Sequence, residues 1–153
     1  MVIAVAGATG NVGGALARIL AADGHEVRAI VRRAGGRTWP EGVVEVVGDL
    51  ADGAGLRDAF AGADGAFLLS GYDDAGLVAA LREGRVPRVA LLSSSSAPTG
   101  DLGNAVAAYH LRSEQALRDS AGMDLPAPEL LHDQRARVGG GDPRRSARRG
   151  AVR

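Results

Sequence analysis

The sequence predicts an α/β fold built on one doubly wound parallel sheet. Residues 1–33 read as a strand, a glycine turn, a helix and a second strand, which together make a βαβ unit. Apolar runs then alternate with segments of helical spacing, as in parallel strands joined by right-handed crossovers. With 153 residues and 46% hydrophobic composition, the chain is long enough for one domain with a sizeable core.

The first βαβ unit starts almost at the first residue. Residues 2–6 form a continuous apolar run, and a glycine-rich turn follows at residues 7–13. Residues 25–32 alternate between apolar and polar side chains, as a half-buried strand does. The helix between the two strands is indicated by apolar residues at helical spacing: Val12, Leu16, Ile19 and Leu20.

Three glycines in the turn have separate physical roles. Gly7 can adopt the backbone angles of a tight turn, Gly10 leaves room for a pyrophosphate, and Gly13 lets the helix pack close to the strand. The free N–H groups and the dipole at the helix start favour the phosphate charge. An ordinary glycine turn is the alternative, but the strand–turn–helix context favours a dinucleotide site.

Arg32 and Arg33 end the second strand, at the position where a site for NAD usually has Asp or Glu to hold the ribose 2′-hydroxyl. Arginine suits a 2′-phosphate instead, through charge-assisted and often bidentate hydrogen bonds. The position therefore predicts NADP(H) as the cofactor, with NAD(H) less favoured. The alternative is a solvated strand end.

The remaining elements follow in order after a glycine-rich loop at residues 33–42. The predicted strands are residues 43–47, 66–70 and 88–92; the predicted helices are a short one around Leu56, Ala59 and Phe60, residues 73–82 and residues 104–120. Ligands of open α/β sheets bind at the carboxyl ends of the strands. The residues that end these strands are therefore candidates for the site.

Two strand ends carry such candidates. Asp49 can accept a hydrogen bond from an adenine amino group while Leu50 packs on the ring, and the same aspartate can cap the next turn. Ser70 is placed beside the second ribose of the cofactor, although a plain strand-end turn explains it equally well. On the last helix, His110 and Glu114 share a face and could pair; an exposed ion pair of little consequence is the alternative.

Composition excludes several classes of function. The net charge is zero, so nothing global points to nucleic acid or to a membrane surface. The absence of cysteine excludes disulfides, thiolate nucleophiles and cysteine metal sites. All 18 basic residues are arginine, which removes Schiff-base chemistry and lysine-assisted tyrosine catalysis. No apolar run is long enough to span a bilayer and no basic leader precedes the first strand, so a cytoplasmic protein without a metal site is expected.

A set of motifs then gives a specific resemblance. In order, they are Gly-Ala-Thr-Gly-x-x-Gly at residues 7–13, Val31-Arg32, Gly48-Asp49-Leu50, Gly62-x-Asp64, Leu91-Leu92-Ser93 and His110-x-x-Ser113-Glu114. The set resembles the NmrA-like, atypical short-chain dehydrogenase/reductase group, and within it the NAD(P)H:quinone reductase and triphenylmethane reductase types. The resemblance covers residues 1 to about 124, and the His-x-x-Ser-Glu motif on the last helix is the most specific of these motifs.

The resemblance implies a Rossmann cofactor domain over residues 1–124, followed in relatives by a small substrate lobe. It implies that NADPH is bound by Gly7, Thr9, Gly10, Asn11, Val12, Arg32 and Asp49, with Ser70 and Ser93 near the ribose and nicotinamide. Quinone-type members pass hydride directly to a small quinone-like acceptor, so the missing Tyr-x-x-x-Lys pattern does not exclude reduction. His110 stands where some relatives carry lysine, and it could orient or protonate the acceptor.

The resemblance stops after about Asp124. Residues 125–153 read as an unpatterned tail rich in Arg, Gly and Pro, and Pro126 and Pro128 argue against a central strand. We expect no sixth strand, no substrate lobe, and self-association through the uncovered sheet edge. We interpret this tail as the result of truncation or of a frameshift. The frameshift hypothesis rests on a shifted reading frame that can yield Phe-Leu-Arg-Pro, the peptide expected from the family, and the coding DNA tests it.

Two further interpretations compete with a reductase domain. One is a non-catalytic NADP(H) sensor that binds the cofactor and signals through a partner. The other is an inactive truncated product that folds poorly. Turnover of NADPH with quinones would favour the reductase, whereas binding without turnover also fits the sensor.

Overall fold

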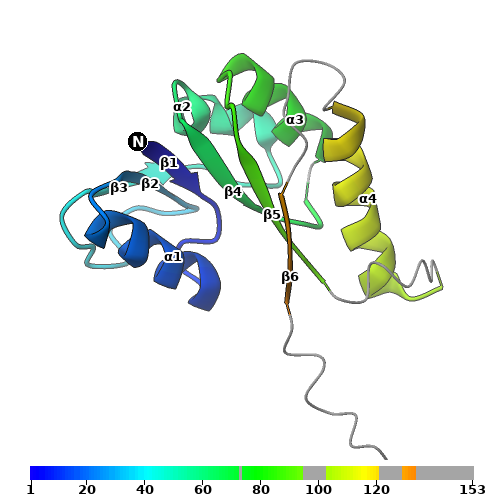
Figure 1. Ribbon diagram of the computed structural model, residues 1–153, viewed down its shortest axis with the longest axis horizontal. Helices are drawn as coiled ribbons and strands as arrows, with labels where there is room; N and C mark the ends of the chain where they lie inside the picture. Colours follow the sequence, from blue (N-terminus) through cyan, green and yellow to red (C-terminus); the bar gives the residue numbers. More distant parts are fainter. Residues whose placement is uncertain (73, 95–102, 121–128, 134–153) are drawn as a thin grey trace, which may run out of the picture.

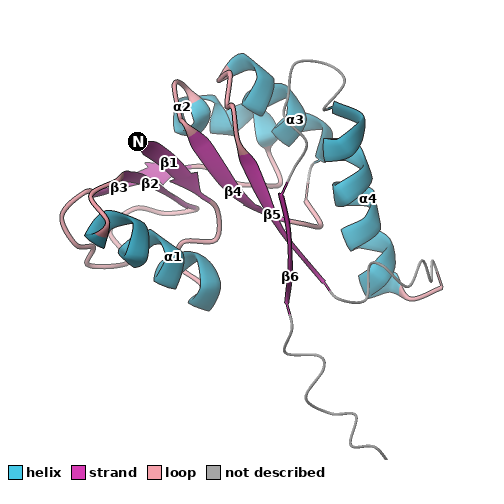
Figure 2. Ribbon diagram, in the orientation of Figure 1, coloured by secondary structure: helices cyan, strands magenta, loops and turns pink. Residues whose placement is uncertain are grey.

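The computed structural model describes residues 1–72, 74–94, 103–120 and 129–133 and has the predicted doubly wound parallel sheet (Figures 1 and 2). The predicted strands and helices are confirmed, with ends that differ by one or two residues from those predicted. The elements are β1 Val2–Val5, α1 Asn11–Ala22, β2 Glu26–Val31, β3 Val43–Val47, the 3-10 turn η1 Gly53–Leu56, α2 Arg57–Phe60, β4 Gly65–Leu69, α3 Asp74–Glu83, β5 Val89–Ser94, α4 Ala105–Ser120 and β6 Glu129–Asp133.

The strands lie in the order β3-β2-β1-β4-β5-β6, and every neighbouring pair is parallel. The chain fills the sheet from β1 outward to β3, then crosses back over the sheet to place β4 on the other side of β1. The connections after β1 and β4 therefore run in opposite directions from the middle of the sheet. This switch point is where ligands of such sheets bind, at the carboxyl ends of the strands.

Side chains that alternate along β1 build two cores. Ala4 and Ala6 belong to the core that also contains Phe60 and Leu81, while Val5 faces the other core, with Ala17 of α1. Helix α1 covers one face of the sheet, and α2, α3 and α4 cover the other (Figure 1). Burial on both faces explains why β1 and β4 read as unbroken apolar runs.

Helix α1 buries only part of the apolar stripe that its sequence spacing predicts: Leu16 and Leu20 pack against the core. Val12 and Ile19 are 51% and 58% exposed, whereas Gly13, Gly14 and Ala17 are buried. The small residues on the buried face let the helix axis approach the sheet closely, while Val12 and Ile19 are turned outward. The periodicity thus predicts the helix correctly but not the whole of its buried face.

The expectation that the sheet lacks a sixth strand is wrong. Strand β6 pairs in parallel with β5, with Leu130 opposite Leu91 and Leu131 opposite Leu92. The two prolines at 126 and 128 precede this strand, so they remove no N–H group from its ladder. The predicted uncovered edge beside β5 is therefore occupied by a segment of the chain itself.

Most of the predicted tail lies outside the described residues, as do Asp73 and residues 95–102. The described part of the tail belongs to the sheet, so the boundary expected near residue 124 does not mark the end of the fold. Across the ranges that the structure describes, no helix combines the length and the apolarity needed to cross a membrane.

Candidate functional site

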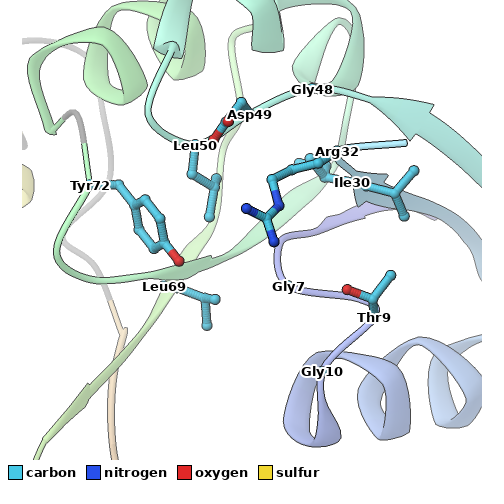
Figure 3. A pocket seen from close by; sticks show the side chains of 11 residues that line it. Gly7, Thr9, Gly10, Ile30, Arg32, Gly48, Asp49, Leu50, Leu69 and Tyr72 are labelled. Atoms are coloured by element: carbon cyan, nitrogen blue, oxygen red, sulfur yellow. The ribbon is translucent and has the colours of Figure 1, made fainter. Parts of the chain in front are cut away.

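A cleft of roughly 270 Å³ opens at the carboxyl ends of the strands around the switch point (Figure 3). Six of the predicted site residues line it: Gly7, Thr9, Gly10, Arg32, Asp49 and Leu50. Ile30, Val31, Gly48, Leu69 and Tyr72 complete the lining. The cleft thus brings together the ends of β1, β2 and β3 with the first residues after β4.

The turn after β1 has the geometry expected from its glycines. Gly7 has φ +61°, a left-handed conformation that side chains rarely adopt, and a Cβ there would meet Cδ1 of Leu69 at 2.6 Å. The Gly10 N–H donates to the Gly7 carbonyl at 2.8 Å and closes the turn. The backbone of the glycine turn therefore forms the floor of this part of the cleft, with the Leu69 side chain beside Gly7.

Gly13 permits the close packing of α1 on the strand end. A Cβ at this position would lie 2.5 Å from the Gly7 carbonyl oxygen, well inside contact distance. Gly10 is the N-cap of α1 and has no side chain with which to satisfy the first N–H groups. The exposed residues Asn11 and Val12 form the first turn, so this helix start is suited to an anion.

Arg32 and Asp49 place opposite charges at the end of the cleft beside β2 and β3. Arg32 is exposed, and its guanidinium points into the cleft from the end of β2, on the side where Thr9 lies (Figure 3). The Asp49 carboxylate accepts from the Ala51 N–H at 3.0 Å, so the capping role predicted for it is confirmed. Leu50 is only 7% exposed and supplies an apolar wall.

Tyr72 is the lining residue that sequence reasoning missed. Its ring projects into the cleft from the loop after β4, facing the side from which Arg32 points (Figure 3). It is 45% exposed and stands two residues beyond Ser70, in a segment without periodicity. The available signal was its position directly after a predicted strand end, where ligands bind.

A second cleft of roughly 210 Å³ adjoins the first through Leu69. Its lining combines the ends of β4 and β5 with one side chain of α4: Leu69, Ser70, Leu92, Ser93, Ser94 and His110. The Ser70 hydroxyl lies within hydrogen-bond distance of the Leu92 carbonyl, at 3.0 Å, and contacts Nδ1 of His110. A serine that donates its single proton to Leu92 accepts from Nδ1–H, which fixes the orientation of the imidazole.

Glu114 is a buried anchor, and the interpretation of it as part of an exposed ion pair is wrong. It is 3% exposed, accepts from the Ser93 hydroxyl at 2.5 Å, and lies 3.1 Å from a guanidinium nitrogen of Arg118. One residue earlier, the Ser113 hydroxyl accepts from the Gly71 N–H at 2.9 Å. The Ser-Glu pair therefore fixes α4 against the ends of β4 and β5 and holds His110 at the second cleft.

Within the described ranges, no three or more His, Cys, Asp or Glu side chains are placed to share an ion. The described lining of the two clefts offers backbone amides, hydroxyls, one imidazole, the Asp49 carboxylate and the Arg32 guanidinium. A backbone floor, a helix start and a cation together fit a ligand that carries several phosphate groups.

Solved structures share this fold. Citrobacter sp. triphenylmethane reductase, solved with NADP(H), is 28% identical; the match covers 87% of this chain and 49% of that chain, with a TM-score of 0.68. A Burkholderia pseudomallei protein is 27% identical over 78% of this chain and 66% of that chain, with a TM-score of 0.60. A wide-type short-chain dehydrogenase/reductase from Veillonella parvula DSM 2008, solved with NADP, is 21% identical. The match covers 86% of this chain and 68% of that chain, with a TM-score of 0.69.

The chain thus spans about half the length of the triphenylmethane reductase. No curated protein matches it. The sequence pattern of the NmrA-like family matches residues 1–95, which include β1 to β5 and every residue that lines the first cleft. With its Rossmann-type sheet, the chain belongs to the NmrA-like family.

Proposed function

We propose that this chain is the NADP(H)-binding domain of an oxidoreductase. The single observation that carries the proposal is the Arg32 guanidinium, which points from the end of β2 into a cleft floored by the glycine turn. At that position a cation suits a ribose 2′-phosphate, whereas a carboxylate would suit a free hydroxyl. The NADP(H) in the structure of the 28% identical triphenylmethane reductase supports the same ligand.

We assign described residues to successive parts of this cofactor. Gly7, Gly10 and the first amides of α1 would hold the pyrophosphate, since the N-cap Gly10 has no side chain that could occupy these amides. Asp49 and Leu50 would bound the adenine, and the Tyr72 ring adds a second apolar surface in the same cleft. Ser70 and Ser93 would lie near the nicotinamide end, in the adjoining cleft.

When bound, NADPH supplies a hydride, and a quinone reduced to its hydroquinone also needs one proton. His110 is the titratable group in the second cleft and is held there by Ser70. We propose that it orients a small quinone-like acceptor and delivers that proton. One hydride and one proton together convert the quinone to hydroquinone and NADPH to NADP⁺.

A titration of the purified chain with NADPH, with NADH as the comparison, tests the cofactor assignment. We expect NADPH to bind more tightly, and Arg32→Ala to weaken NADPH binding by roughly 10- to 100-fold, because it removes charge-assisted hydrogen bonds. NADH binding should stay unchanged. Arg33→Ala is the matched control, since Arg33 is the neighbouring exposed arginine and does not line the cleft. Equal binding of NADPH by Arg32→Ala and wild type would reject the phosphate assignment.

Turnover separates the reductase from a cofactor sensor. NADPH oxidation in the presence of a water-soluble quinone would support hydride transfer, and His110→Ala should slow it. Tight binding without turnover favours the sensor. It is also the result expected of a reductase domain that needs, for catalysis, the part of its relatives that this chain does not span. If neither nucleotide binds, the proposed function fails.

A further inference from the structure

Glu45 on β3 holds the loop between β2 and β3 in one conformation. Its two carboxylate oxygens accept from different parts of that loop: Oε2 from the Gly35 N–H at 2.6 Å, and Oε1 from the Trp39 indole N–H at 2.8 Å. Both bonds lower the pKa of Glu45 from its ordinary value, the Gly35 bond most. The side chain is therefore a carboxylate at neutral pH, and it links two points within the loop, Gly35 and Trp39.

Arg37 extends from this fixed loop to the glycine turn. Its Nη2 donates to the Thr9 carbonyl at 2.8 Å, and its guanidinium carbon lies 5.9 Å from the centre of the Trp39 ring. Arg18 of α1 approaches the same ring at 5.9 Å, but its own hydrogen bond goes to Gly14 within the helix. Of these two arginines, Arg37 is therefore the one that connects the Trp39 ring to the glycine turn.

The Thr9–Gly10 peptide is the part of the turn that this contact fixes. Its carbonyl points to Arg37, and its N–H, on Gly10, donates to the Gly7 carbonyl at 2.8 Å. Arg37 is absent from the lining of the first cleft, whereas Thr9 and Gly10 belong to it. Arg37 thus contacts the site from behind, through the backbone.

We propose that Glu45, Trp39 and Arg37 form a clamp that positions the glycine turn for the pyrophosphate of a dinucleotide. The clamp rests on the proposed function, because the glycine turn must bind that ligand. All three are positioning residues: each acts through the Thr9–Gly10 peptide. Pyrophosphate is common to NADPH and NADH, so the clamp strengthens the binding of both to the same degree. Arg32, in contrast, acts on NADPH alone.

Measuring the affinity of each variant for NADPH and for NADH tests the clamp directly. We expect Arg37→Ala to weaken NADPH and NADH by the same factor, about fivefold, the effect of one lost hydrogen bond. Arg37→Lys should regain most of the loss, since an ammonium can also donate to the Thr9 carbonyl. Glu45→Gln should cost about two- to threefold for both, because an amide oxygen accepts in place of only one carboxylate oxygen. Arg18→Ala, the matched control, removes the other cation from Trp39 and should bind both nucleotides as wild type does.

Fluorescence reports the clamp itself, because Trp39 is the one tryptophan of the chain. Glu45→Gln should shift its emission to the red as the indole becomes more hydrated, with unfolding temperature and far-UV circular dichroism unchanged.

A loss of NADPH affinity alone in Arg37→Ala would overturn the proposal, because it would mean direct contact with the 2′-phosphate. Unchanged affinities, or an equal loss in Arg18→Ala, would overturn it too. If wild type binds neither nucleotide, the proposed function fails and the clamp fails with it; if wild type binds and Arg37→Ala matches it, only the clamp fails.

Discussion

The two clefts at the carboxyl edge of the sheet are built in different ways. The first is shaped mainly by backbone: a glycine in the left-handed region, a helix start without a side-chain cap, and a close helix–strand approach. The second is shaped by hydrogen bonds between side chains and strand ends. Its bonds link Ser70 to His110, Gly71 to Ser113 and Ser93 to Glu114.

The two clefts also differ in how far apart along the chain their hydrogen-bonded residues lie. The hydrogen bond that closes the glycine turn joins two residues of the turn itself, Gly10 and Gly7, so this part of the geometry can be predicted from the local sequence. The bonds of the second cleft join residues 40, 42 and 21 positions apart. Such a site depends on the docking of α4 against β4 and β5. Mutations at the two clefts should therefore affect cofactor affinity and stability in different proportions.

Glu114→Ala should give the largest loss of stability. It removes a buried carboxylate and leaves the buried Ser93 hydroxyl without this acceptor, so we expect the free energy of unfolding to fall by roughly 3 kcal/mol. Denaturant titration measures this. The matched control is Glu83→Ala, which breaks the exposed 2.7 Å pair with Arg57 and should cost less than about 1 kcal/mol. Equal losses in the two variants would mean that Glu114 does not anchor α4.

Gly13→Ala should damage the first cleft instead. The added methyl group would lie 2.5 Å from the Gly7 carbonyl, so α1 must move outward, at a cost of about 2 kcal/mol of stability. NADPH affinity should fall at the same time, because the helix start shifts with it. Gly36→Ala is the control, since a Cβ there meets nothing within 4 Å. An unchanged NADPH affinity in Gly13→Ala would show that this close approach does not shape the site.

Ser113→Ala should have the smallest effect, about 1 kcal/mol, because it removes one neutral hydrogen bond, to the Gly71 N–H. The sharper readout is amide hydrogen exchange at Gly71, which should become faster. Ser120→Ala serves for comparison: its hydroxyl donates to Leu117 of the same helix, so Gly71 exchange should stay unchanged. Slow exchange at Gly71 in Ser113→Ala would contradict a role for Ser113 in docking α4.

Sequence reasoning located β1 to β5 and six residues of the first cleft because each depends on local pattern. It missed β6, since the register that places Leu130 and Leu131 beside β5 comes from the neighbouring strand, not from periodicity. For Glu114 it predicted a pair with His110 or an exposed ion pair, since helical spacing cannot show that the Ser93 hydroxyl donates to this carboxylate. The clamp of Glu45, Trp39 and Arg37 was missed for the same reason, because its contacts join separate segments. Tyr72 was missed although its position after a predicted strand end was a signal.

By itself, the sequence determined the alternation of strands and helices, the tight turn at Gly7 and the cation that ends β2. Dihedral preferences, hydrophobic periodicity and charge are properties of short segments, so they can be read without a fold. Only the tertiary structure decided which face of α1 is buried, that β6 joins the sheet, and that Glu114 is an anchor. Burial and hydrogen-bond partners depend on which distant segments meet, and packing of the whole sheet settles that.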